Sequence, residues 1–109
     1  MSQMDVIVIH IRKEQAQEYE RLFEQEELVR WREYHRAGKF LNARFYRSEF
    51  GSEQSADVVR YVIVVEVPSM AEHSAHDQDP GFRDFDQKVD SLQPRPPLVF
   101  GGDLVHAVG

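Results

Sequence analysis

The sequence contains no cysteine among its 109 residues. This absence excludes disulfide bonds, thiolate catalysis and cysteine-ligated zinc. Long hydrophobic runs are also missing, since the longest aliphatic ones are V-I-V-I at 6–9 and V-I-V-V at 62–65. A membrane-spanning helix needs about 20 apolar residues, and the opening M-S-Q-M-D lacks the basic and apolar segments of a signal peptide. We therefore expect a soluble, cytoplasmic protein with no membrane partner.

Positive charge is scarce as well. Lysine and arginine number 13 against 19 acidic residues, which gives a net charge of −6. This balance argues against a nucleic-acid partner, because such partners attract basic surfaces. The sequence also lacks a Ser-His-Asp signature, a phosphate-binding glycine loop and a dinucleotide fingerprint. An apolar fraction of 41% supports a globular core, and the length predicts a single domain over 1–109.

Four segments have the pattern of β-strands. Residues 5–11, D-V-I-V-I-H-I, are rich in β-branched side chains and have polar flanks. Similar signals predict strands over 40–50, 58–67 and 98–108, of which 58–67 is the strongest. In the last of these segments, Gly101 and Gly102 suggest a β-bulge.

Two further regions predict helices. Residues 14–37 are rich in Glu, Gln, Arg, Leu and Ala, and basic residues gather toward the end, where Gly38 is a good terminator. Ser69 and Glu72 form a capping box that begins a shorter helix. Asp79 and Pro80 predict the start of another helix, with aspartate as the N-cap and proline in the first turn.

The long helix has an imperfect apolar stripe. The apolar group around Phe23 and the group around Trp31 are offset by roughly a quarter turn at about 100° per residue. Two explanations remain open. Either the helix kinks near 25–27, or Glu27 and Arg30 point inward as a polar pair between the two groups.

The element order β-α-β-β-α-β predicts the ferredoxin-like α+β arrangement, a four-stranded antiparallel sheet with its helices on one face. The second face of such a sheet is polar when it meets water. Here the strands over 5–11 and 58–67 are apolar on both faces, yet no helix is left to cover the second. We therefore predict an obligate homodimer packed through the sheet face opposite the helices.

The stretch 66–82, E-V-P-S-M-A-E-H-S-A-H-D-Q-D-P-G-F, together with this topology, resembles the antibiotic biosynthesis monooxygenase family. That family belongs to the dimeric α+β barrel group. Its members carry a pattern like A-x-x-x-H-x-x-S-P-H-F after a strand that ends in glutamate. Glu66, His76, Pro80 and Phe82 stand at matching positions.

The same stretch departs from the family pattern at three places. Asp79 replaces a serine, Gly81 stands where histidine is frequent, and Pro68 stands where a tryptophan often lines the substrate pocket. The resemblance implies cofactor-free oxygenation, in which the substrate is deprotonated and its anion reacts with oxygen. The protein would then supply a base, an oxyanion partner and a dry pocket.

His76 is the candidate catalytic residue. Its imidazole could act as a general base or donate a hydrogen bond to a substrate oxygen. The alternative is structural, because a histidine at a helix end can bond the last carbonyls or the loop around Asp79. His73 lies three residues earlier and is a candidate pocket residue on the same helix face. With His76, and with Asp77 and Asp79 nearby, it could suggest a metal, but the sequence contains no HExxH spacing, so we expect no metal site.

The remaining candidate pocket residues come from other segments. Trp31 and Tyr34 either wall a pocket between helix and sheet or pack in the core. His10 is surrounded by apolar residues and is expected to share a sheet face with His106, lining a cavity or forming part of the core or dimer interface. Arg44 is the last candidate.

Arg44 shares one strand face with Asn42 and Tyr46, and Arg60 lies on the neighbouring predicted strand. Together these side chains could bind a carboxylate or enolate oxygen. The alternative is that the arginines are solvated or paired across a dimer.

The sequence leaves three functions open. The leading one is a cofactor-independent, monooxygenase-like enzyme, or a related isomerase or lyase, acting on a small hydrophobic or aromatic, polyketide-like molecule. The second is a non-catalytic dimeric module for small-ligand binding or stress response. The third is a haem-binding or haem-degrading protein with His76, His73 or His10 as axial ligand.

Overall fold

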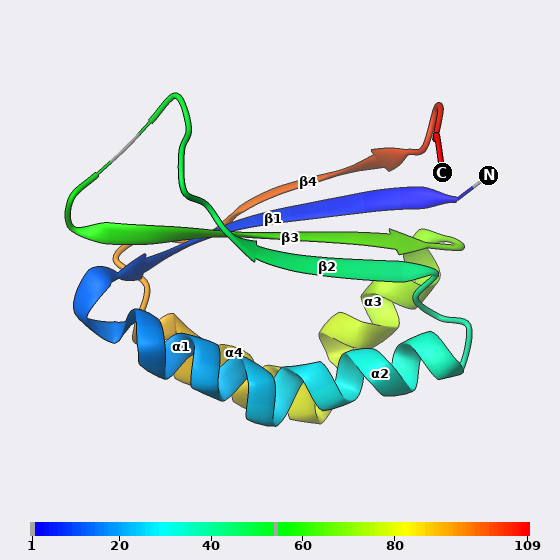
Figure 1. The fold of residues 1–109 in the computed structure, drawn as a ribbon. Helices are drawn as coiled ribbons and strands as arrows, with labels where there is room; N and C mark the ends of the chain where they lie inside the picture. Colours follow the sequence, from blue (N-terminus) through cyan, green and yellow to red (C-terminus); the bar gives the residue numbers. More distant parts are fainter. Residues whose placement is uncertain (1, 54) are drawn as a thin grey trace.

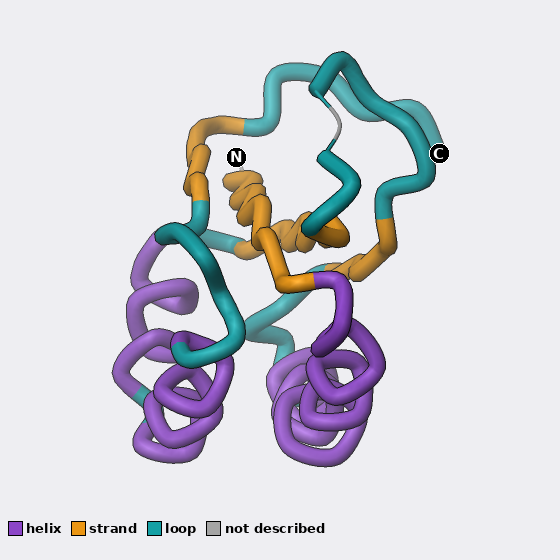
Figure 2. The backbone as a smooth tube through the Cα atoms, turned by 90° about the vertical axis from the view of Figure 1, so that its left-hand side faces the viewer, coloured by secondary structure: helices purple, strands orange, loops and turns teal. Residues whose placement is uncertain are grey.

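The computed structural model describes residues 2–53 and 55–109. These residues form an antiparallel sheet of four strands in the order β2-β3-β1-β4. Figures 1 and 2 show the helices on one side of this sheet. The predicted ferredoxin-like α+β fold is therefore confirmed. The strands are β1 (Gln3–Arg12), β2 (Asn42–Arg47), β3 (Val58–Val67) and β4 (Leu98–Asp103).

The edge strands are shorter than the sequence suggested. Strand β2 begins at Asn42 and ends at Arg47, and β4 ends at Asp103. The predicted bulge in β4 is wrong, because Gly101 and Gly102 pair regularly with Asp5 and Met4 of β1. Neither glycine has a positive φ. The pair therefore fits an ordinary extended strand, and a Cβ at either position would meet no atom closer than 3.6 Å.

The predicted long helix is continuous but not regular. It consists of a 3-10 turn, α1, a π-helical segment and α2. At the π-helical segment the Leu28 N–H donates to the Phe23 carbonyl, five residues earlier. The helix ends at Arg36, and Gly38, just after the C-cap residue Ala37, has a φ of +74° that fits the predicted glycine terminator. The four parts are Lys13–Gln15, Ala16–Leu22, Phe23–Glu27 and Leu28–Arg36.

The π-helical segment resolves the offset in the apolar stripe. In a regular α-helix, the side chains of Phe23 and Trp31 would point about 80° apart around the helix axis. The π-helical turn contains one extra residue, which reduces this angle to about 20°. Both side chains are buried and their rings meet edge to face at 4.9 Å. The two open explanations both hold in part. The helix is distorted at the predicted place, and Glu27 points inward with only 3% of its surface exposed.

The helices that follow β3 are α3 (Met70–Gln78) and α4 (Pro80–Asp90). Asp79 caps α4 as predicted, since its carboxylate accepts from the Gly81 N–H at 2.8 Å. Ser69 stands at the start of α3 as predicted, but its hydroxyl donates to the Glu72 carboxylate instead of binding a backbone N–H. The junction is therefore fixed mainly by Asp79 and Pro80.

An aromatic cluster joins the helices to the covered face of the sheet. Phe23 stacks on Phe45 at 4.1 Å between ring centroids, and Phe45 stacks on Tyr61 at 5.4 Å. Tyr19 meets the Tyr61 ring edge to face at 4.9 Å. Aromatic pairs of this kind stabilise a core beyond their buried area. The helix layer is thus anchored firmly over β2 and β3.

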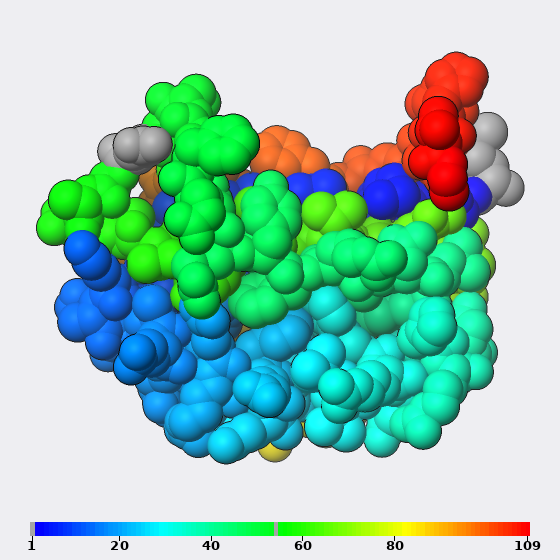
Figure 3. All heavy atoms as spheres, in the orientation of Figure 1, coloured from blue at the N-terminus to red at the C-terminus, as the bar shows by residue number. Residues whose placement is uncertain are grey.

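The other sheet face has no helix over it among the described residues (Figure 1). Figure 3 shows this face in profile as a hollow between the β2–β3 loop and the C-terminal tail. Alternation along the strands places an apolar patch there, with Leu98 48% and Phe100 60% exposed. We call it the uncovered sheet face. Its apolar residues include Val6, Val8, Val62, Val64, Leu98 and Phe100.

Across the described residues, no helix has the length and apolar character that crossing a membrane requires.

Candidate functional site

A cavity of 400 Å³ lies between the helix layer and the covered face of the sheet. This volume is within the range of small-molecule sites. Aromatic and aliphatic side chains make most of its wall, which suits a hydrophobic ligand. These include Tyr19, Phe23, Trp31, Phe40, Ile63 and Phe85.

The cavity reaches solvent between α4 and β4. Arg83 and Asp86 of α4 line it and are exposed, and Val99 of β4 is 57% exposed. The opposite end is closed, because Tyr19 there is fully buried. A ligand would thus enter beside the edge strand and rest against the aromatic cluster.

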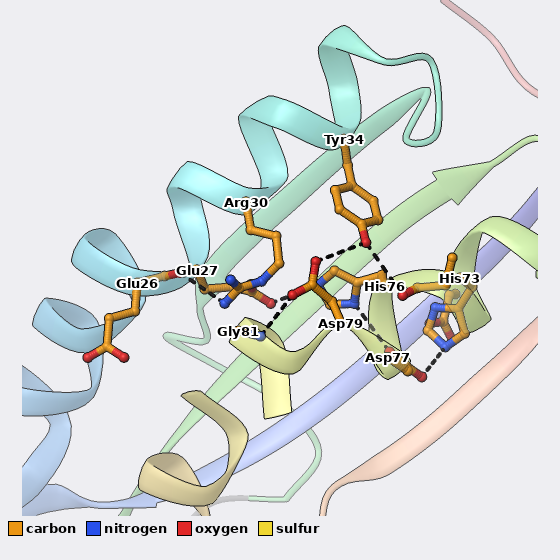
Figure 4. A network of polar contacts seen from close by, with 11 residues as sticks. Glu26, Glu27, Arg30, Tyr34, His73, His76, Asp77, Asp79 and Gly81 are labelled. Atoms are coloured by element: carbon orange, nitrogen blue, oxygen red, sulfur yellow. Dashed lines mark hydrogen bonds and ion pairs between the residues drawn. The ribbon is translucent and has the colours of Figure 1, made fainter. Parts of the chain in front are cut away.

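One wall of the cavity carries alternating carboxylates and imidazoles, which Figure 4 shows in part. Asp5 Oδ2 lies 2.8 Å from His73 Nδ1, and His73 Nε2 lies 3.0 Å from Asp77 Oδ2. Asp77 Oδ1 lies 3.2 Å from His76 Nδ1, and His76 Nε2 lies 3.0 Å from Glu27 Oε2. We call these five residues the imidazole–carboxylate chain. Each of its imidazole nitrogens faces a carboxylate oxygen.

Each member of the chain has a local reason for its place. Asp5 shares a strand face with Ile7 and therefore points toward the helices. His73 and Asp77 are four residues apart on α3, which brings them together on one helix face. Glu27 ends the π-helical segment, so the extra residue there turns its carboxylate toward α3. The chain thus links β1, α3 and the long helix.

The carboxylates favour charged imidazoles. Asp5 first, and then Asp77, raise the pKa of His73 to about 10, although burial opposes them. Burial lowers the pKa of His76, but Asp77 and Glu27 outweigh it and the pKa is raised. Burial likewise raises the pKa of Asp77, yet the two imidazoles bring it well below its usual range. Near neutral pH His73 is therefore an imidazolium, and the charged form of His76 is favoured.

Arg30 fixes the position of Glu27, the carboxylate partner of His76. Arg30 donates from Nε to Glu27 Oε1 at 2.8 Å and from Nη2 to the Glu26 carbonyl at 3.0 Å. A Cβ at Gly81 would lie 2.6 Å from Arg30 Nη1. The glycine at this place, where the family pattern often has histidine, therefore leaves room for the guanidinium.

Most sequence-predicted site residues fall in or beside this cavity. His73, His76 and Trp31 line it. Tyr34 lies behind His76, with ring centroids 5.5 Å apart and its hydroxyl 3.3 Å from Asp79 Oδ2. Arg44 lines neither of the cavities described here, and its guanidinium donates to the Ala43 carbonyl.

His10 belongs elsewhere. It lines a second cavity near the other end of β1. The expectation that His10 and His106 share a sheet face is wrong, because β4 pairs only with residues 3–8 of β1 and ends at Asp103. Leu104 donates to the Ser2 carbonyl, so the chain leaves β4 near the start of β1, whereas His10 lies toward its end.

Sequence reasoning missed Asp5, Tyr19 and Asp86 as cavity residues. A signal existed for Asp5, because a carboxylate on the same strand face as Ile7 and Ile9 must be buried with them. Tyr19 lies on the same apolar helix face as Phe23, and its hydroxyl has no hydrogen-bond partner within the described residues. No sequence signal distinguished Asp86 from other helix-surface acids.

The histidines fit a haem poorly. Both ring nitrogens of His73 and of His76 lie within 3.2 Å of carboxylate oxygens. His10 Nε2 is held between two guanidinium groups. Axial ligation would require a nitrogen lone pair directed at iron, and each of these histidines would first have to lose an ion pair or hydrogen bond.

We predict that His73 makes the stability of the protein pH-dependent in the alkaline range. Its pKa rises from 6.5 to about 10 in the fold. The resulting stabilisation is complete below pH 6.5 and is lost as the pH rises through about 10. In His73→Gln, the free energy of unfolding from urea titrations should therefore fall less over this interval than in the wild type. The exposed His35→Gln variant should follow the wild type, and equal slopes for all three proteins would refute the prediction.

Comparison with known proteins supports the fold. No protein-family model matches the sequence, and no curated protein matches it. Solved structures do match. A proposed antibiotic biosynthesis monooxygenase from Caulobacter crescentus has a TM-score of 0.73 and 17% identity, over 96% of this chain and 91% of that one. Rv0793 from Mycobacterium tuberculosis has a TM-score of 0.76 and 14% identity over the full length of both chains.

A third match is a variant of SnoaB from Streptomyces nogalater, which is described as a cofactor-independent oxygenase. Its TM-score is 0.70 and its identity 13%, over 98% of this chain and 96% of that one. At such identities the matches establish a shared fold. The fold-level resemblance to structures described as antibiotic biosynthesis monooxygenases is confirmed.

Proposed function

We propose that this protein is a cofactor-independent oxygenase that acts on a small hydrophobic, aromatic molecule within the 400 Å³ cavity. The observation that carries the proposal is the imidazole–carboxylate chain on one wall of an otherwise largely apolar cavity. The fold shared with SnoaB adds support by analogy.

The proposed reaction converts a CH₂ group next to an aromatic ring into a carbonyl. A base removes one proton, and the resulting anion donates electrons to oxygen. A carbon–oxygen bond forms and the oxygen–oxygen bond breaks. One oxygen atom stays in the product as the carbonyl, and the other leaves as water with the two hydrogens of the original CH₂ group.

His76 stabilises the anion in this scheme. Its raised pKa favours the charged imidazolium. Because both ring nitrogens face carboxylates, His76 acts through its positive charge, which lowers the energy of a developing oxyanion. Asp86 accepts the proton. Burial, followed by Asp90 and Asp77, raises the pKa of this carboxyl group, which makes it a better base than an ordinary carboxylate. Its place at the exposed mouth lets the proton pass on to water.

The working unit in this proposal is a homodimer formed through the uncovered sheet face. The apolar residues of that face need a cover, and a second copy offers a matching surface. The cavity lies on the helix side of the sheet, so this packing leaves its mouth open.

Oxygen uptake with an anthrone tests the proposal. The wild type should consume oxygen faster than the buffer background, and His76→Gln and Asp86→Asn should each lower the rate by roughly 10²-fold or more. The exposed His35→Gln variant serves as the control and should keep the wild-type rate. Circular dichroism and thermal melts must show that the variants fold.

Two results would contradict the oxygenase. One is an uptake rate for the wild type that equals the background with every anthrone tested. The other is a His76→Gln variant that folds and keeps the full rate. Saturable quenching of Trp31 fluorescence by the anthrone, without oxygen uptake, would favour the second candidate, a non-catalytic ligand-binding module. That candidate is supported by the carboxylate partners that occupy both nitrogens of His76.

A further inference from the structure

A second cavity, of 520 Å³, lies at the end of the sheet where β1 finishes and β3 begins. Among the described residues, none lines both cavities. Its polar groups include His10 from β1, Arg60 from β3 and Arg95 from the segment between α4 and β4. We call these three residues the arginine–histidine cluster. They come from distant parts of the sequence, so only the fold brings them together.

His10 is shared by two cations. Its Nε2 lies 3.2 Å from Arg60 Nε and 2.5 Å from Arg95 Nη2. A guanidinium group can only donate, so Nε2 must be the acceptor and the ring proton resides on Nδ1. Burial, and then the charges of Arg95 and Arg60, lower the pKa of His10. The imidazole is therefore neutral near pH 7 and does not add to the charge.

The cluster has more donors than acceptors, and the backbone acceptor that Arg60 Nη1 uses is the Glu53 carbonyl, at 2.8 Å. His10 is only 1% exposed, and its Nδ1 has no hydrogen-bond partner within the described residues. The carboxylate nearest to Arg60 is that of Glu53, at 3.6 Å, and this side chain is 78% exposed. Within the described residues, Arg95 forms no ion pair with a carboxylate. Two guanidinium groups that meet at one nitrogen repel each other unless an anion lies nearby.

We propose that the arginine–histidine cluster binds the phosphate group of a small molecule. A phosphate carries close to two negative charges at neutral pH and several acceptor oxygens, which matches two guanidinium groups with free N–H bonds. Ser52 and Ser55 also line the cavity and offer hydroxyl donors of the kind that bind phosphate oxygens. This site is separate from the oxygenase cavity, and its test does not depend on the reaction proposed there.

Calorimetric titration with inorganic phosphate, at constant ionic strength set by chloride, tests the proposal. We expect saturable binding, at least tenfold weaker in Arg95→Gln and in Arg60→Gln. The matched control is Arg32→Gln, which removes the same charge from an exposed position on α2 and should bind as the wild type does. Phenyl phosphate and acetate complete the series. Tighter binding of phenyl phosphate would identify a phosphomonoester as the ligand, and equal binding would identify free phosphate.

Nitrogen NMR of the histidine rings provides a second readout that does not depend on the variants folding. Free protein should show His10 as the neutral Nδ1–H tautomer, and phosphate should shift its ring signals while leaving those of His35 unchanged. The proposal is overturned if the wild type shows no saturable binding, if acetate binds as tightly as phosphate, or if Arg32→Gln weakens binding as much as Arg95→Gln.

Discussion

Replacing Glu27 by alanine should destabilise the protein by about 3–5 kcal/mol, the cost of removing one partner from a buried ion pair. Glu27 is 3% exposed, and the side chain of its partner Arg30 is 12% exposed. The same carboxylate also faces His76 Nε2 at 3.0 Å. Without it, the Arg30 guanidinium would remain buried next to the His76 ring with no carboxylate between them, and the π-helical segment would lose its contact with α3.

The matched control is the neighbouring residue. Glu26 pairs with Lys88, but the two side chains are 30% and 54% exposed. Exposed pairs contribute about 0–1 kcal/mol, so Glu26→Ala should change the free energy of unfolding little. Urea denaturation of both variants at one protein concentration makes the comparison. If Glu27→Ala lowers the free energy of unfolding no more than Glu26→Ala does, the imidazole–carboxylate chain does not hold the helices together.

Placing an aspartate at Val64 should break the proposed homodimer. Val64 lies opposite Val6 on the uncovered sheet face. In a monomer the new carboxylate would remain hydrated, but in a dimer it would be buried without a partner, at a cost of about 3–5 kcal/mol. A twofold axis places the substitution in the interface twice. The dissociation constant of the dimer should therefore rise by roughly 10²-fold or more.

Sedimentation measures this effect directly. Val29→Asp is the control, because Val29 is 48% exposed on α2, on the helix side of the sheet. It should leave the assembly as in the wild type. A wild type that sediments as a monomer at micromolar concentration would exclude the homodimer, and a Val64→Asp variant that stays dimeric would exclude this face as the interface.

The order of the elements followed from local patterns. Runs of β-branched residues marked the strands, and Gly38 and Asp79 marked helix boundaries that the structure confirms. Such signals depend on a few neighbouring residues, so a single sequence is enough to recognise them. Strand limits were less certain, because pairing decides them. Residues after Asp103 are apolar enough to continue β4, but they have no further partner residues on β1.

Only part of the candidate site could be predicted from the sequence. The sequence directed attention to His76 and His73, and it raised the inward orientation of Glu27 as one of two explanations for the offset helix stripe. It could not show that Asp5 and Glu27 reach these histidines, because 68 residues separate Asp5 from His73 and 49 separate Glu27 from His76. Contacts of this range depend on how the helices settle on the sheet. The surroundings of His10 are a second example, since Arg95, which contacts it, lies 85 residues further along the sequence.

The sequence by itself determined the α+β topology, the helix junction at Asp79 and Pro80, and the apolar character of both sheet faces, because each depends on residue type and short spacing. Only the tertiary structure decided which charges meet. It alone placed two imidazoles between three carboxylates and a third imidazole between two guanidinium groups. Electrostatic interactions depend on distances across the fold, and a π-helical turn of five residues was enough to direct Glu27 to its partner.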